Sequence, residues 1–336
     1  MVSHDPTYPL FPIASFLSFL LALVPLPWHA QAWNSGTCAF MIWTAVANLN
    51  LFVNSLIWKG NVRNPAPVWC DISAKLYIGV SLGIPAAVLC ISRRLYCLLA
   101  LQATSLTRAD KRKMVAIDIC IAIGIPVIGM VLHYVIQGHR FNILEDIGCY
   151  PSVYNVTLAY PLYLMWAPLL ALVSLVYSVL TLRSFYLRRV QFAQLVSSTS
   201  GMSVSRYLRL MVLACVDIMF NLPLGILVIW IGGRGMGPDP WLSWEDTHYG
   251  FSRVDKFPAK LWRLDPMYEV SIELTRWLPV FCSFLFFALF GFAEEARKNY
   301  RKAFWRVASV FGIKPRPASP KAPKSLLPRY AICIIP

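Results

Sequence analysis

The chain has 336 residues, of which 57% are hydrophobic and 14% charged, and its mean hydropathy is +0.57. Ordinary soluble domains carry about 25% charged residues, so a soluble protein of this length would have too little polar surface to cover itself. The formal net charge of +15 could suggest nucleic acid, but most Lys and Arg lie beside one set of span ends and in the C-terminal tail. That distribution follows the positive-inside rule, and we expect a bilayer-embedded protein with no nucleic-acid partner.

Seven apolar stretches follow one another along the chain. Each is long enough for a helix to cross the bilayer core, which takes about 20 residues. The first could be a secretory signal, but no basic residue precedes it and its apolar core is too long, so we interpret it as an uncleaved span. The predicted spans cover about residues 8-28, 33-58, 71-97, 114-137, 158-182, 207-232 and 271-293.

The number of these spans and the charges of the segments that flank them predict the topology. Seven passes place the two termini on opposite sides of the membrane. Ten Lys and Arg follow residue 293 and none precedes the first span, so we expect an extracellular N-terminus and a cytoplasmic C-terminus. The predicted fold is an all-α membrane protein, with a bundle of seven transmembrane helices over residues 1-293.

Beyond the seventh span, residues 294-312 predict a juxtamembrane amphipathic helix on the inner leaflet, with Lys and Arg around an apolar stripe. The stripe consists of Tyr300, Phe304, Val307 and Phe311. Residues 313-336 are rich in Pro, Ser and Lys, which predicts a short disordered cytoplasmic tail. Near its end, Cys333 lies in the position of a prenylation box, but Pro336 is a poor final residue for one, so its modification stays open.

Enzyme signatures are missing from the sequence. It has no HExxH, GxSxG, Walker loop or CxxC pair, and its five histidines are scattered, so we expect no enzyme, cofactor or metal site. A transporter or channel is the alternative function, but no internal repeat is visible. An intramembrane enzyme would need a nucleophile or a metal set near one membrane face. A seven-helix decoy that no longer couples also stays open.

Several polar residues fall inside the predicted spans. Asp118 lies near the cytoplasmic start of the fourth, and Asp217 lies deeper in the sixth, where we treat it as a candidate switch. The alternative for Asp217 is a hydrogen bond to a neighbour such as Asn221 or Ser174. Asparagines of the second span are interpreted as contacts between helices: Asn48, Asn50 and Asn54.

Two adjacent cations end the third span. Arg93 and Arg94 point in different directions on a helix, so one can reach lipid headgroups while the other holds the inner face of the bundle closed.

Polar and aromatic residues gather at the predicted outer ends of the spans, where a ligand could be read. Glu273 and Arg276 could instead pair with each other, and Trp and Tyr also favour the membrane interface. The candidate ligand-binding residues are Lys75, Tyr134, Gln137, His139, Arg140, Glu145, Asp146, Tyr160, Trp166, Trp262, Glu269, Glu273 and Arg276.

Other residues of the predicted outer loops suggest an oxidising, glycosylating compartment. Cys70 and Cys149 lie where oxidation can occur. Asn155 begins the sequon Asn-Val-Thr and is a glycosylation candidate.

Three blocks of the sequence carry a family resemblance: NSGTCAFMIWTAVANLNLFVNSLIW, PVWCDISAKLYIGVSLGIPAAVLCISRRLYCLLA and IQGHRFNILEDIGCYP. They resemble the fungal lipopeptide mating-pheromone receptors of the a-factor receptor type, which are class D G-protein-coupled receptors. LPWHAQAWN, SVSRYLRLM and GFAEEARKNYRKAF also match, so the resemblance covers roughly residues 8 to 306. The composition resembles receptors of mushroom-forming basidiomycetes.

The resemblance implies a plasma-membrane receptor for a prenylated peptide pheromone, coupled to a heterotrimeric G protein, and it leaves a homodimer open. It also implies that Cys70 and Cys149 join the third span to the second outer loop. The tail after Lys314 is shorter than in many relatives, so a truncated gene model is one expectation. The candidate G-protein-coupling residues are Arg93, Arg94, Arg108, Arg112, Arg188, Arg189, Arg206 and Arg209.

Overall fold

The computed structural model describes residues 5–100, 107–187, 204–234 and 237–292, and a few further residues between 296 and 309. Among these residues, seven helical segments are long and apolar enough to cross a membrane, and all lie in the first of two compact units, Met1–Ala296. Their helices are α1 (Leu10–Leu23) with α2 (Leu26–Gln31), α3 (Ser35–Ile57), α4 (Pro67–Ala100), α5 (Arg108–Ile119) continued by η1 (Cys120–Gly124), α6 (Ile125–Leu132) and η2 (His133–Ile136), α7 (Trp166–Leu187), α9 (Val204–Gly232) and α12 (Pro266–Phe290).

Helix α4 lies at the centre of this bundle. It packs against α3, α6, α7 and α9, and 72% of its apolar window is buried. Large apolar side chains on the other spans point outward instead: Val131 is 66% exposed, Leu172 49% and Met219 71%. Apolar surface of this extent would be unfavourable in water, so these faces are suited to lipid.

A tryptophan of α3 forms a hydrogen bond with the fourth span at the point where the regular α-helix of that span is interrupted. Pro126 has no N–H to donate to the carbonyl of Ala122, four residues earlier, and the helix forms a π turn there, η1. Trp43 Nε1 donates to that carbonyl oxygen at 2.8 Å. The same indole packs on Gly83 of α4, where a Cβ would lie 2.4 Å from the ring. Three spans therefore meet at one fixed side chain.

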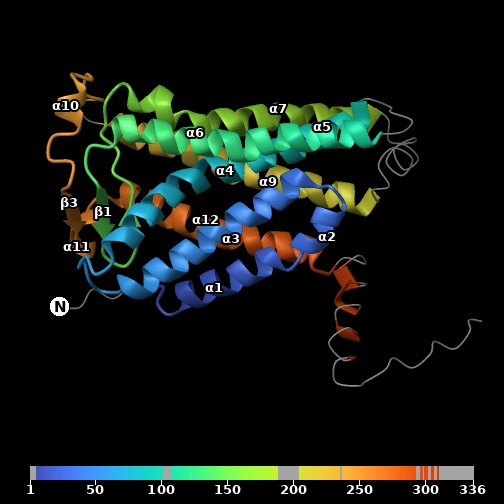
Figure 1. Cartoon of the computed structure of the whole chain (residues 1–336), viewed down its shortest axis with the longest axis horizontal. Coiled ribbons are helices and arrows are strands. Elements are labelled where there is room, and N and C mark those ends of the chain that lie inside the picture. The colour runs from blue at the N-terminus through green and yellow to red at the C-terminus, as the bar shows by residue number, and fades with distance from the viewer. Residues whose placement is uncertain are drawn as a thin grey trace, which may run out of the picture. The chain divides into compact units, whose positions relative to one another are not determined.

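A small three-stranded sheet covers one end of the bundle (Figure 1). Strand β1 (Phe141–Leu144) pairs antiparallel with β2 (Gly148–Tyr150) and parallel with β3 (Val254–Phe257). The prediction of an all-α chain is right for the seven spans but missed this sheet, whose strands are only three or four residues long. At the same end of the bundle lie α10 (Trp244–Thr247) and α11 (Ala259–Trp262), and η3 (Tyr160–Leu164) precedes α7 (Figure 1). We call this end of the bundle the sheet end.

The contact between Trp43 and Gly83 can be tested by adding one methyl group. We expect Gly83→Ala to cost about 1–3 kcal/mol because the indole is held by Ala122 and cannot move aside. The thermal unfolding temperature of the detergent-solubilised protein should fall by several degrees. Gly124→Ala is the matched control, since a Cβ there meets nothing within 4 Å. A similar loss in both variants would contradict the proposed packing.

Candidate functional site

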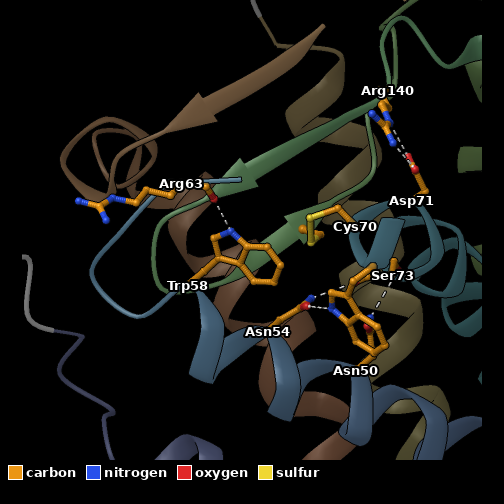
Figure 2. Close-up of a disulfide and its surroundings, with 10 residues drawn as sticks. Asn50, Asn54, Trp58, Arg63, Cys70, Asp71, Ser73 and Arg140 are labelled. Carbon is orange, nitrogen blue, oxygen red and sulfur yellow. Dashed lines mark hydrogen bonds and ion pairs between the residues drawn. A yellow bond between two sulfur atoms is a disulfide. The ribbon is translucent and has the colours of Figure 1, made fainter. Parts of the chain in front are cut away.

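A disulfide ties the sheet to the bundle. Cys70 at the start of α4 and Cys149 of β2, the pair implied by the family resemblance, are bonded and almost completely buried. Just below, Asn54 Nδ2 donates to Ser73 Oγ at 2.9 Å and joins α3 to α4 (Figure 2). Deeper in the bundle, Asn48 Nδ2 donates to Ser283 Oγ of α12, also at 2.9 Å. The interpretation of these asparagines as contacts between helices is confirmed.

Beside the disulfide, a cavity of about 340 Å³ opens between α4, the end of the fourth span and the loops. Four of the predicted ligand-binding residues line it together: Lys75, Tyr134, Gln137 and Arg140. The remaining lining residues are Asp71, Ala74, His133, Phe251 and Ser252. The cavity therefore combines charged, amide and aromatic groups, as expected of a site that binds a ligand with both polar and apolar parts.

Two polar contacts define the walls of this cavity. Arg140 Nε and Nη2 donate to the two carboxylate oxygens of Asp71, at 2.8 and 2.5 Å (Figure 2). The two opposite charges of this ion pair therefore balance each other. The hydrogen bonds to Asp71 and, to a smaller extent, the charge of that carboxylate raise the pKa of Arg140 above its ordinary value. Lys75 Nζ instead meets two neutral groups, Gln137 Oε1 at 2.7 Å and His133 Nδ1 at 3.0 Å.

Several other predicted ligand residues are structural in this arrangement. Glu145 accepts a hydrogen bond from the Ala259 N–H at 2.7 Å, and Trp262 Nε1 donates to the Glu145 carbonyl. His139 contacts Asn142, with Asp255 3.5 Å away. These contacts fasten β1, β3 and α11 together outside the cavity lining.

Further candidates lie at other edges of the sheet end. Tyr160 donates to Asn155 Oδ1 at 3.3 Å, and the Trp166 indole donates to the Pro161 carbonyl at 2.9 Å. Asn155 Nδ2, the atom that a glycan would modify, donates to the Gly232 carbonyl at 2.8 Å. Glu269 lies 3.7 Å from Arg263.

A buried ion pair that the sequence did not reveal joins the start of the chain to α12. Arg276 is 3% exposed, and its guanidinium donates to Asp5 at 2.7 Å and to Glu273 at 3.2 Å. It also stacks on the Phe11 ring, 3.7 Å from the ring centre. Burial raises the pKa of Asp5, but the hydrogen bond and charge of Arg276, together with hydrogen bonds from Thr7, hold that pKa below its ordinary value. The predicted i, i+3 pair is present, yet Asp5, 271 residues away, is the closer partner.

At the opposite end of the bundle, the third and fourth spans are joined by a second ion pair. Arg93 Nη2 lies 2.6 Å from Asp118 Oδ1, and Ser35 at the start of α3 donates to the other carboxylate oxygen at 2.5 Å. Asp118 is 1% exposed. We call this cluster the inner ion pair, because the sequence predicts that this end of the bundle faces the cytoplasm. Arg94 points elsewhere, to the Trp33 carbonyl, so the two arginines do divide their contacts.

The other candidates at that end differ in setting. Arg108 and Arg112 are exposed on α5, and Arg209 donates to the Leu289 carbonyl of α12 at 3.1 Å. Arg188, Arg189 and the side chain of Arg206 lie outside the described residues.

Asp217 is buried in α9 and lies against the seventh span. It accepts a long hydrogen bond from Cys282 Sγ at 3.7 Å, and it has no ion-pair partner among the described residues. Asn221, the neighbour expected from the sequence, donates to the backbone oxygen of Asp217 at 3.3 Å.

Comparison with known proteins identifies the family. A profile described as pheromone A receptor matches residues 10–310, a range that includes all seven spans. The chain belongs to the pheromone A receptor family. This is a family of receptors and not of enzymes, and with seven candidate spans the protein is a multi-pass membrane protein.

The curated relatives are fungal receptors. The chain is 50% identical to the pheromone B alpha 3 receptor of Schizophyllum commune over 327 residues, which are 97% of this chain and 52% of that protein. It is 33% identical to pheromone receptor 1 of Mycosarcoma maydis, over 91% of this chain and 86% of that one. It is 27% identical to the pheromone a factor receptor of Saccharomyces cerevisiae, over 85% and 59%. The chain spans about half the length of the Schizophyllum receptors that it matches.

Asp146, a predicted ligand residue, gives a pH-dependent prediction. Its buried carboxyl accepts the Gly60 N–H at 2.8 Å, with Arg263 at 4.0 Å, and burial raises its pKa above the ordinary 3.8. The folded state then binds this proton more tightly than the unfolded state, so its contribution to stability is lost as pH rises through the folded-state pKa.

Asn can accept the same hydrogen bond and tolerates the backbone φ of +70° at this position. The stability of Asp146→Asn relative to wild type should therefore increase as the pH rises from the ordinary pKa of 3.8 through the raised folded-state pKa. Thermal unfolding across that range measures the difference, with exposed Glu245→Gln as control. A difference independent of pH would contradict the prediction.

Proposed function

We propose that the chain is a plasma-membrane G-protein-coupled receptor for a prenylated peptide pheromone. The observation that carries this proposal is the family match across all seven spans, together with a cavity at one end of the bundle. Membership of a receptor family disfavours the transporter or channel alternative. Exposed Arg108, Arg112 and Arg183 lie at the end opposite the sheet, so the positive-inside rule favours a sheet end that faces outward.

A partly exposed aromatic cluster supports a ligand with an apolar chain. Tyr134 and Phe251 line the cavity and lie 5.6 Å apart, and both also contact His248. His248 stacks on Trp244 at 4.0 Å. Aromatic surface at the mouth of a polar cavity suits a peptide with a hydrocarbon group at one end.

The proposed mechanism is a shift between two packings of the bundle. A ligand must favour the active packing by roughly 5.5 kcal/mol to move the equilibrium from 1:99 to 99:1. A 15-carbon chain buries about 0.8 kcal/mol per CH₂, but most of that energy is common to both packings. The polar groups of the cavity therefore discriminate between the states. On the inner side, the spans separate enough for a heterotrimeric G protein to bind between them.

The direct test is expression of the full chain in a mating-pathway reporter strain challenged with synthetic farnesylated, carboxyl-methylated peptides. At least one peptide should activate the reporter at nanomolar to micromolar concentration, and its unfarnesylated form should be at least tenfold weaker, because burial of the chain contributes to affinity. Surface labelling controls for expression. Silence with every cognate peptide, at normal surface levels, would contradict the proposed function.

Loss of the inner ion pair should raise signalling without ligand. Asp118→Asn removes the partner of Arg93, and a change of about 1.4 kcal/mol between packings alters their ratio tenfold. We expect a several-fold higher basal reporter signal from Asp118→Asn and from Arg93→Gln. The double variant should be no higher than either single one, because both remove the same contact.

Asp110→Asn is the matched control for this prediction, since Asp110 is exposed on the same helix and its described side-chain hydrogen bonds go to Thr107. Basal activity equal to wild type in all variants would show that the inner ion pair does not hold the resting state.

A further inference from the structure

The cavity at the sheet end carries one positive charge that no carboxylate neutralises. Lys75 forms no ion pair among the described residues, although Asp71 lies four positions earlier on the same helix and lines the same cavity. The carboxylate of Asp71 is taken instead by Arg140, which binds both of its oxygens. Lys75, Asp71 and Arg140 together leave the cavity with a net charge of +1.

The contacts of Lys75 hold its ammonium group in place. An ammonium has three N–H donors, and the described contacts to Gln137 and His133 use two of them. Gln137 is fixed in turn, since its Nε2 donates to the Arg140 carbonyl at 2.7 Å. The third donor is available to a ligand without any rearrangement, which is the condition for strong recognition of an anion.

The imidazole beside Lys75 also has unused capacity. His133 is 1% exposed, and when its Nδ1 accepts the Lys75 N–H, its Nε2 must carry the ring proton. Among the described residues, Nε2 has no hydrogen bond of ordinary length and angle, although the Ser152 backbone interacts with the ring. A buried donor without such a hydrogen bond is unfavourable, so the polar network around Lys75 is incomplete on two counts.

We propose that this cavity recognises a carboxylate of the peptide ligand, the side chain of an Asp or Glu, through an ion pair with Lys75. Tyr134 and Phe251 then cover the adjoining apolar part of that ligand residue. The inference rests on the proposed function in that the ligand is a peptide. It adds a determinant of specificity, because a peptide with an amide at the same position leaves Lys75 buried without a counter-charge.

The experiment is a double-mutant cycle between receptor and ligand. Each Asp and Glu of a farnesylated peptide that activates the wild-type receptor is replaced in turn by Asn or Gln, with the C-terminus kept as methyl ester throughout. One of these replacements should weaken binding to wild-type receptor in membranes by roughly 10- to 100-fold. On Lys75→Gln the acid and amide peptides should bind within about twofold of each other. A matched peptide with a free C-terminal carboxylate, in place of the methyl ester, shows whether Lys75 pairs with the peptide terminus and not with a side chain.

Two further variants separate recognition from folding. Lys75→Arg keeps the charge and should retain most of the preference for the acid peptide, whereas Lys75→Glu should prefer a peptide with Lys at that position. Lys260→Gln is the matched control, because Lys260 is exposed on α11 at the same end and has no described contact. Surface labelling confirms that each variant reaches the membrane.

The outcomes are separable from those of the proposed function. Two results would overturn the recognition of a carboxylate while leaving the receptor function intact. One is an active peptide that contains no carboxylate. The other is an equal loss of affinity for the acid and amide peptides on Lys75→Gln, which would indicate that Lys75 makes a structural or lipid-headgroup contact. If no peptide activates the wild type, protection of Lys75 from reductive methylation by the α-methyl ester of N-acetylglutamate, but not by the α-methyl ester of N-acetylglutamine, still tests the cavity in the full chain. Equal protection by both probes would overturn the proposal.

Discussion

The covalent link between α4 and β2 positions the groups on which the candidate site depends. Cys70 and Cys149 are 79 residues apart, and their bond holds the hairpin of β1 and β2 against the start of the central helix. The bond is buried among Trp58, Phe141 and Ile143, so the sheet end has its own apolar cluster. With the hairpin fixed, Arg140 just before β1 reaches Asp71 just after Cys70. That ion pair in turn leaves Lys75 without a carboxylate.

Helix α4 also connects the two ends of the bundle. Lys75 and Arg93 are 18 residues apart, or about 27 Å at 1.5 Å per residue. Between them, Gly83 packs directly on the Trp43 indole, which is itself bonded to the fourth span. Because core contacts this close leave little free space, a displacement of α4 at this point also displaces Trp43 and the fourth span. The inner ion pair joins that same helix to the second and fourth spans, where such a movement would break it.

Hydropathy and charge sufficed to predict the seven spans, because a bilayer core imposes one length and one composition on every crossing helix. Four ligand candidates do share a cavity, but the same criterion also selected Glu145 and Trp262, which fasten loops. The position of a polar side chain at the end of a span does not indicate whether that side chain is already hydrogen-bonded or ion-paired within the protein. The partners themselves are remote in sequence: Asp5 lies 271 residues from Arg276, and Asp118 lies 25 from Arg93. Strands as short as β2 carry too few residues for an alternating pattern.

Charge compensation distinguishes the cavity from the other polar clusters. Arg93, Arg140 and Arg276 each meet a carboxylate within 2.7 Å, as expected for cations that are partly or wholly removed from water. Among the described residues, Lys75 meets an amide oxygen, a neutral imidazole and, 5.7 Å from its ammonium, the ring of Tyr134, and none of these groups is a carboxylate that balances its charge. A protein of this composition has few charges to place, and one left uncompensated in a cavity reduces the stability of the ligand-free state. An incoming carboxylate relieves that cost at the moment of binding, so its contribution to affinity depends on the packing that holds Lys75 in place. If the two packings of the bundle hold the lysine differently, the ion pair contributes to the difference in ligand-binding free energy between them. Burial of a hydrocarbon chain contributes little to that difference, because most of its energy is common to both packings.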